Sequence, residues 1–166
     1  TLSFPSVVLA GERTQLMEVK AVSSGYPLRG VLRVALTGYG AEMPTDSIPE
    51  SGTVWLDARA LNALGLVVGD VLHLGNLNLR VTKVLAYEPD RGGDFFSIAP
   101  RLLMNVADVP RTGLLGPGSR VSYRLLLAGR RDALLSVREK LEPGLEAGQR
   151  FLDAGDARHQ PCDEFL

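Results

Sequence analysis

The sequence predicts an α+β fold, and three local patterns indicate it. Between residues 71 and 81, apolar residues alternate on both sides of Gly75-Asn76, which is typical of a β-hairpin with a two-residue turn. Residues 132–141 carry leucine and valine at helical spacing, with charged residues on the opposite face. Asp57 follows a short strand and can accept the free amides at the start of a helix that ends before Gly65.

Composition places the chain among ordinary globular proteins. The 166 residues suit one domain, or two small subdomains that share a core, and 45% of them are hydrophobic. The net charge of −1 gives no bulk attraction to nucleic acid, so we expect no nucleic-acid partner. The single Cys162 excludes an internal disulfide, and no apolar run reaches the ~20 residues that span a bilayer.

The N-terminal residues predict a second hairpin, in which residues 1–10 pair with residues 13–22. Alternation in the second strand turns its apolar side chains towards a core. By the same alternation, Glu18 and Lys20 are expected to face water.

The segments between these elements predict connections and shorter elements. Residues 37–52 contain glycine and proline but few large apolar residues, which indicates a surface connection. Residues 101–105 predict a strand, followed by a short helix over residues 107–112. Residues 121–127 predict a further strand, and residues 149–152 a returning strand after the last helix.

Lys83 interrupts the apolar phase of its strand, between Val81 and Leu85. Two explanations remain open at this point. Either the side chain extends towards solvent, or a β-bulge near Thr82 resets the alternation.

Side chains that could carry out catalysis are few. Only His73 and His159 supply an imidazole, and no Gly-x-Ser-x-Gly turn accompanies them. His159 and Cys162 lack the paired spacing of structural zinc ligands. The glycines at 92 and 93 do not continue into the Gly-Lys-Ser/Thr of a nucleotide-binding loop. We therefore predict no catalytic, cofactor-binding or metal-binding residues.

The loop of residues 88–96 is the most distinctive candidate for a contact with another molecule. Its three carboxylates could hold a hard cation, although their spacing is not that of an EF-hand and Arg91 would partly neutralise them. Its two adjacent phenylalanines could instead anchor a partner surface. The candidate partner-contact residues are Asp90, Arg91, Asp94, Phe95 and Phe96.

A longer stretch carries a family resemblance. Residues 52–109 read GTVWLDARALNALGLVVGDVLHLGNLNLRVTKVLAYEPDRGGDFFSIAPRLLMNVADV. This order of capped helix, Gly-Asp turn, hairpin and long strand resembles the extracytoplasmic core domain of FtsX/MacB-type ABC transporter permeases. The motif EPDRGGDFF, together with VKAVSSGYPLRG at residues 19–30, is similar to the large permeases encoded beside a lysophospholipase/thioesterase. The likeness covers about residues 13–130.

The resemblance implies a MacB-like periplasmic core. Residues 1–36 and 120–152 would form a porter-type α/β subdomain, preceded in the family by a further strand and helix. Residues 37–119 would form an inserted β-rich sabre-type subdomain, and residues 153–166 a tail. The domain would lie on the periplasmic side of the bacterial inner membrane, as part of a multi-pass protein that can dimerise.

The same resemblance implies a function without catalysis. A separate cytoplasmic ABC ATPase would supply the energy, and this domain would couple that motion to a lipid-like or hydrophobic substrate or to a periplasmic partner such as the lysophospholipase/thioesterase. Two alternatives remain open from the residues alone. One is a soluble metal-dependent hydrolase that uses the loop of residues 88–94, and the other is a free-standing adaptor that binds protein through Phe95 and Phe96.

Overall fold

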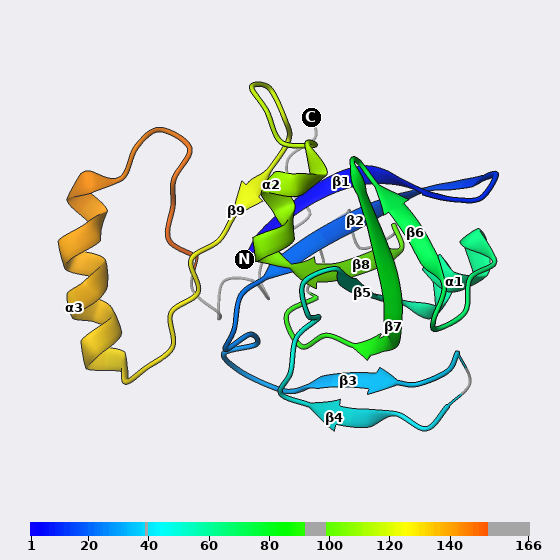
Figure 1. Ribbon diagram of the computed structural model, residues 1–166. Helices are drawn as coiled ribbons and strands as arrows, with labels where there is room; N and C mark the ends of the chain where they lie inside the picture. The colour runs from blue at the N-terminus through cyan, green and yellow to red at the C-terminus, as the bar shows by residue number, and fades with distance from the viewer. Residues whose placement is uncertain (39, 92–98, 153–166) are drawn as a thin grey trace, which may run out of the picture. The chain divides into compact units, whose positions relative to one another are not determined.

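The computed structural model describes residues 1–38, 40–91 and 99–152. The chain divides into two compact units, Thr1–Leu126 and Leu127–Leu166 (Figure 1). The predicted tail, residues 153–166, lies outside the described residues.

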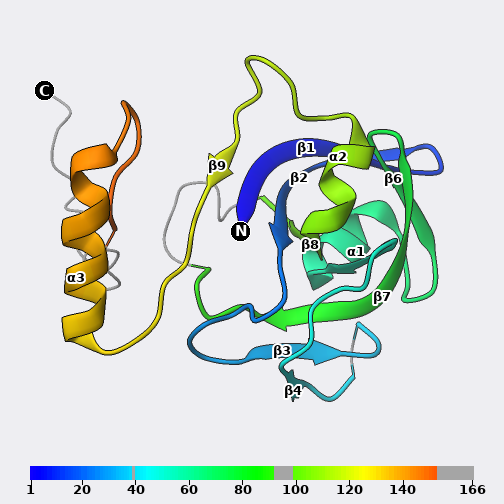
Figure 2. The same ribbon diagram turned by 60° about the vertical axis from the view of Figure 1, so that its left-hand side comes forward.

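Strands of the first unit close into a β-barrel (Figures 1 and 2). Around the barrel the order is β7 (Leu77–Tyr87), β5 (Thr53–Leu56), β8 (Arg101–Asn105), β2 (Arg13–Val22), β1 (Leu2–Ala10) and β6 (Val71–Leu74), which pairs again with β7. The pairs β2–β8 and β5–β7 are parallel, and the other pairs around the barrel are antiparallel. Closure pairs the edges that an open sheet would expose.

Both predicted hairpins are confirmed. The first joins β1 to β2 in a register that runs from Leu2 opposite Ala21 to Ala10 opposite Arg13. The second joins β6 to β7 through Gly75, whose φ of +56° is the left-handed conformation that the turn requires.

The barrel interior is filled by the inward-facing side chain of every second residue. Apart from Phe4, the buried side chains of this core are aliphatic or methionine, and each of them is at most 7% exposed. The largest fully buried side chains of this core are Val8, Met17, Val19, Leu56, Leu72, Leu74, Leu79, Leu102 and Met104.

A bulge in β7 keeps this alternation inside the barrel. Val54 pairs with Val81, whereas the next residue, Trp55, pairs with Lys83, so Thr82 is the extra residue. Of the two explanations for Lys83, the bulge near Thr82 is therefore confirmed. Lys83 turns to the outer face, where its ammonium lies 4.7 Å from the centre of the Trp55 ring.

A second, smaller core lies on the outside of the barrel. Strand β3 (Leu32–Ala35) pairs with β7, and β4 (Met43–Thr45) pairs with β3. The prediction of residues 37–52 as a surface connection is wrong for β4, because the open edge of β3 offers it a partner. The buried side chains of this core are Val22, Tyr26, Leu32, Val34, Trp55, Leu85 and Leu103.

Both short helices of the barrel unit lie where the sequence predicts a helix. Helix α1 (Ala58–Leu64) begins where the Asp57 carboxylate accepts a 2.9 Å hydrogen bond from the Ala60 amide, and it ends at Gly65 with a φ of +65°. Strand β8 leads, as predicted, into a 3-10 turn, η2 (Val106–Asp108), and helix α2 (Val109–Thr112).

The second unit contains the predicted amphipathic helix, α3 (Arg131–Leu141), followed by η3 (Glu142–Gly144). No residue of α3 is buried, and no described helix is long and apolar enough to span a membrane. The predicted strand at 149–152 is wrong, since the chain there has no strand partner among the described residues.

The predicted strand over residues 121–127 shrinks to β9 (Ser122–Tyr123). Strand β9 pairs with the first two residues of β1 in antiparallel fashion. After Arg124 no residue of β1 remains to pair with the chain, because β1 begins at Leu2.

The division of the structure differs from the division predicted at residues 37 and 119. Strands β1 and β2 come from residues 1–36, yet they pair with β6 and β8 from residues 37–119 in one barrel. The boundary between compact units lies instead after Leu126. The assignment of porter-type and sabre-type subdomains stays a prediction.

The turn between β6 and β7 gives a test of close packing. A Cβ atom added at Gly75 would lie 2.1 Å from the carbonyl oxygen of Thr112, whose backbone also accepts a 2.8 Å hydrogen bond from the Asn76 amide. Gly11 has the same φ of +56° but no atom within 4 Å of an added Cβ.

We predict that Gly75→Ala lowers the free energy of unfolding by about 1–3 kcal/mol more than Gly11→Ala, because only the first adds a steric overlap to the same backbone strain. Urea denaturation of both variants measures the difference. Equal losses would contradict the packing of this turn against α2.

Candidate functional site

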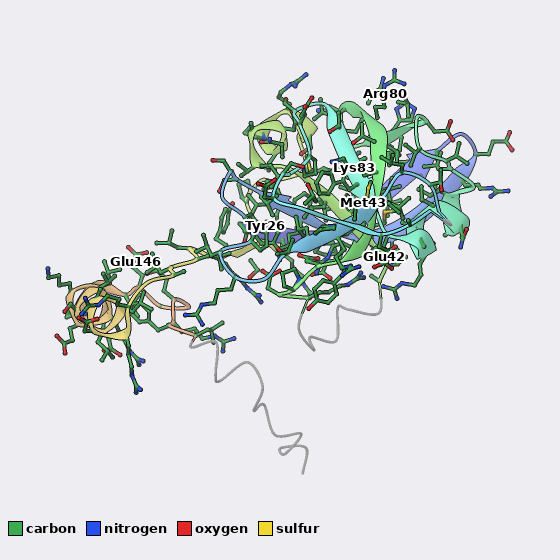
Figure 3. All side chains as sticks on the ribbon, turned by 90° about the horizontal axis from the view of Figure 1, so that it is seen from below. Tyr26, Glu42, Met43, Arg80, Lys83 and Glu146 are labelled. Atoms are coloured by element: carbon green, nitrogen blue, oxygen red, sulfur yellow. The ribbon has the colours of Figure 1, made fainter. Side chains whose placement is uncertain are left out.

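A buried charged network lies on the outer face of the barrel, where β2, β8 and the end of β7 meet. It consists of Glu18, Lys20, Tyr26, Glu88, Asp90 and Arg101. The outward phase of β2 supplies Glu18 and Lys20, and the parallel pairing of β2 with β8 sets Arg101 beside Glu18. Tyr26 comes from the segment before β3, and it lies among side chains of the barrel unit in Figure 3.

Lys20 is the centre of this network. Its ammonium donates hydrogen bonds of 2.6 Å to Glu88 Oε1, 2.9 Å to Asp90 Oδ2 and 2.8 Å to the Tyr26 hydroxyl. The same hydroxyl lies within hydrogen-bond reach of Glu88 and of Asp90. One cation therefore joins β2, the segment before β3 and the segment after β7.

Arg101 extends the network to a second cation. Its guanidinium lies 2.9 Å from Glu18 Oε1 and 3.0 Å from Glu88 Oε2. The N–H directions do not meet hydrogen-bond geometry with these oxygens, so the contacts are ion pairs of close approach. Glu88 consequently has a cation at each of its two oxygens.

Burial makes these pairings necessary. The side chain of Glu88 is 0% exposed, and those of Lys20 and Arg101 are 5% exposed, whereas that of Asp90 is 39% exposed. A charge removed from water costs several kcal/mol unless it is paired and hydrogen-bonded. The network pairs each of these charges with an oppositely charged neighbour. Lys20 is also hydrogen-bonded, whereas Arg101 Nε, Arg101 Nη1 and Glu88 Oε2 make no hydrogen bond with the described residues.

The surroundings shift two pKa values. Burial raises the pKa of Tyr26, and the negative charges of Glu88 and Asp90 raise it further, so the hydroxyl keeps its proton. Burial also raises the pKa of Asp90, but the Lys20 charge and the hydrogen bonds from Tyr26 and Lys20 outweigh it and hold that pKa below its usual value.

The prediction that Lys20 faces water is wrong. Alternation places Lys20 on the outer face of β2 correctly, yet Tyr26 lies over its ammonium, 4.7 Å from the ring centre, and Lys20 is buried. Glu18, for which water contact was also predicted, is partly exposed. No alternation pattern signals this network, because Lys20 lies on the polar phase of β2 and β8 has three apolar residues in succession.

A second polar cluster surrounds Asp57. Its Oδ2 atom accepts hydrogen bonds of 3.1 Å from Arg91, 3.2 Å from Arg59 and 3.1 Å from the Arg101 amide. Arg59 and Arg91 also donate to the Ala99 carbonyl, at 3.3 and 3.4 Å. Asp57 therefore caps α1 and holds two guanidinium groups together.

An open pocket of about 330 Å³ lies beside this cluster. Asp57, Arg59, Arg91 and Glu42 supply its charged lining, and alanine, glycine, valine and leucine supply the rest. Glu42 and the neighbouring Met43 lie on the side of the barrel unit that carries β3 and β4 (Figure 3).

The structure separates the predicted partner-contact residues. Asp90 belongs to the buried charged network and Arg91 to the cluster around Asp57, whereas Asp94, Phe95 and Phe96 lie outside the described residues. The two described side chains hold the first part of the loop to the barrel. A role of the five residues in contacting a partner stays a prediction.

The other candidate residues are placed as follows. His73 lies on β6, opposite Asn78 of β7 and Leu9 of β1. His159 and Cys162 lie outside the described residues. Within the described ranges, no three or more metal-ligating side chains are grouped together.

We predict that Lys20→Met lowers the free energy of unfolding by about 3–5 kcal/mol, because it removes one partner of a buried ion pair. The matched control is Arg33→Met, which breaks an ion pair with Glu42 whose two side chains are 50% and 52% exposed, and which costs about 0–1 kcal/mol. Chemical denaturation measures both values. A loss of less than 1 kcal/mol for Lys20→Met would contradict the central place of this ammonium.

Asp90 gives a prediction for acid conditions. Because its folded pKa lies below the unfolded value of 3.8, the stability that its charge contributes is present above that value and is lost as the pH falls through the folded pKa. Wild type is therefore more stable than Asp90→Asn at neutral pH, and the difference shrinks in acid. The exposed Asp46→Asn control changes stability by less than about 0.5 kcal/mol. A difference that stays constant with pH would contradict the assignment.

Comparison with known proteins gives one relation. No known protein-family profile matches the chain. The chain is 37% identical over 150 residues to a protein of Escherichia coli (strain K12) described as the uncharacterized ABC transporter permease YbbP. The match covers 90% of this chain, which spans 18% of the length of that permease. The sequence is therefore similar, over nearly its whole extent, to a segment of an ABC transporter permease.

Proposed function

We propose that this chain is the periplasmic domain of an ABC transporter permease subunit and that it works without catalysis of its own. The observation that carries the proposal is the 37% identity over 150 residues to an ABC transporter permease. A permease of this type works with an ATPase subunit. A cytoplasmic ATPase is therefore the proposed source of energy, and this domain transmits or responds to its motion.

The proposal includes a MacB-like periplasmic core with porter-type and sabre-type parts. A body that transmits motion must keep its shape while it moves. The barrel supports this role, because its strands are paired all around and its interior is filled with apolar side chains. The buried charged network adds a second connection between segments that are distant in the sequence.

The proposed cargo is a lipid-like or hydrophobic substrate, handled directly or through a periplasmic partner such as a lysophospholipase/thioesterase. Exposed aliphatic side chains on the outer face of the barrel support an apolar contact. Val7 and Leu16 are directly opposite each other on β1 and β2, and they are 49% and 55% exposed. The proposed protein contact includes Phe95 and Phe96 of the loop of residues 88–96, called here the acidic loop.

We predict that a cysteine at position 14 is reactive from the periplasmic side in bacterial cells that express the full-length polypeptide containing this chain. Thr14 is exposed at the end of the first hairpin, so Thr14→Cys offers an accessible thiol without disturbing a core. The background carries Cys162→Ser and lacks other cysteines. The measurement is labelling by a membrane-impermeant maleimide after the outer membrane alone is made permeable.

The same cells with a permeabilised inner membrane are the control for total reactivity. Equal labelling before and after this treatment is the expected result. Labelling that requires a permeabilised inner membrane would place the domain in the cytoplasm and overturn the proposal.

A further inference from the structure

We propose that the outer face of the barrel over β2, β1, β6 and β7 binds the same face of a second copy of this chain. The pair has two-fold symmetry, in which Glu18 of each copy lies opposite Arg80 of the other. The inference does not depend on the proposed function. A second copy on this face competes there with any apolar cargo.

The centre of this face is uncharged and mostly apolar. Val7 lies directly opposite Leu16, and Leu9 directly opposite His73, so side chains of three neighbouring strands are adjacent. The aliphatic side chains of the face are between 42% and 55% exposed. An exposed apolar patch without charges is typical of the centre of a protein interface. The outward-facing residues of this centre are Val7, Leu9, Leu16, Val71, His73 and Asn78.

Charges of opposite sign border the two ends of the face. Glu18 lies at one end, opposite Pro5 on β1, and Arg80 lies at the other, opposite Val71 on β6. Both side chains reach solvent, Glu18 with 18% exposure beside Arg101 and Arg80 more fully. In a two-fold pair the contact between Glu18 and Arg80 occurs twice, because each copy supplies both residues. The charges therefore make the face complementary to itself and favour one register of association.

Other occupants suit this face less well. An anionic lipid surface is repelled by Glu18, and it gains a single cation from Arg80 at the far end. The interior of a bilayer would take up His73 and Asn78, whose polar groups need hydrogen-bond partners there. A second copy offers partners to both the charged ends and the apolar centre.

The test is sedimentation equilibrium of the 166-residue chain at concentrations from about 10 μM to about 1 mM. We expect the average mass to rise from 17.9 kDa towards twice that value. The expected dissociation constant is about 10–500 μM, because four short strands offer less than the roughly 800 Å² per partner of a standard interface.

Two variants test the centre and the ends of the face. Leu16→Lys is expected to weaken the dimer about 10-fold or more, because the ammonium would lose its water in the interface. Arg80→Glu is expected to weaken it by a similar factor, because the new carboxylate would lie opposite Glu18 of the second copy. Circular dichroism verifies the fold of each variant.

Leu36→Lys is the matched control. Leu36 follows β3 outside this face, and its 58% exposure is close to the 55% of Leu16. The same substitution there should leave the dissociation constant unchanged.

A cross-link tests the symmetry. Leu9 lies midway between the levels of Glu18 and Arg80 along the strands, on one of the two middle strands, so it is near the two-fold axis. With Cys162→Ser, Leu9→Cys should be joined to its own copy by a short bis-maleimide, whereas Leu36→Cys should not.

Three results would overturn the inference. They are a mass of 17.9 kDa at every concentration, a dimer that Leu16→Lys leaves intact and Leu135→Lys on α3 breaks, and a monomer that binds phosphatidylcholine vesicles. Failure here with the periplasmic labelling intact refutes the dimer alone, because the labelling measures only the side of the membrane.

Discussion

The contact of the Lys20 ammonium with Glu88 is the interaction on which the outer part of this domain depends. The two groups lie 2.6 Å apart and are almost completely buried, so neither can exchange its partner for water. Lys20 lies on β2, Glu88 follows β7, and Tyr26, which contacts both, precedes β3. A buried charge that needs its partner therefore fixes three segments at one point.

This arrangement separates two kinds of stabilisation. Inside the barrel, aliphatic packing supplies a non-directional core, and outside it the buried charged network supplies directed contacts between segments. Asp90 and Arg91 join the beginning of the acidic loop to two different clusters, through Lys20 and through Asp57. A barrel unit built in this way keeps its shape, which is what the proposed role in a transporter requires.

Local features of the fold could be predicted from the sequence, and nonlocal ones could not. Gly75 marked the turn of a hairpin and Asp57 the start of a helix, and Lys83 indicated a nearby bulge as one of two explanations, because each depends on neighbouring residues. The parallel pairs β2–β8 and β5–β7, which close the barrel, join strands that no local pattern connects. The three-residue strand β4 is too short to give a periodic signal.

The candidate site shows the same limit. The sequence pointed to Asp90 and Arg91, but it did not indicate their partners Lys20 and Asp57, because these come from distant segments. Whether Lys20 on the outer face of β2 meets water is decided by the chain that covers it, including Tyr26. Alternation alone specifies a face of the strand and not the burial of that face.

The measurement that tests the account most directly is a double-mutant cycle between Lys20 and Glu88, with Lys20→Met, Glu88→Leu and the combined variant compared in chemical denaturation. If the two charges need each other, the double variant loses far less stability than the sum of the single losses, with a coupling energy of about 2–3 kcal/mol. A coupling energy within about 0.5 kcal/mol of zero would contradict the account.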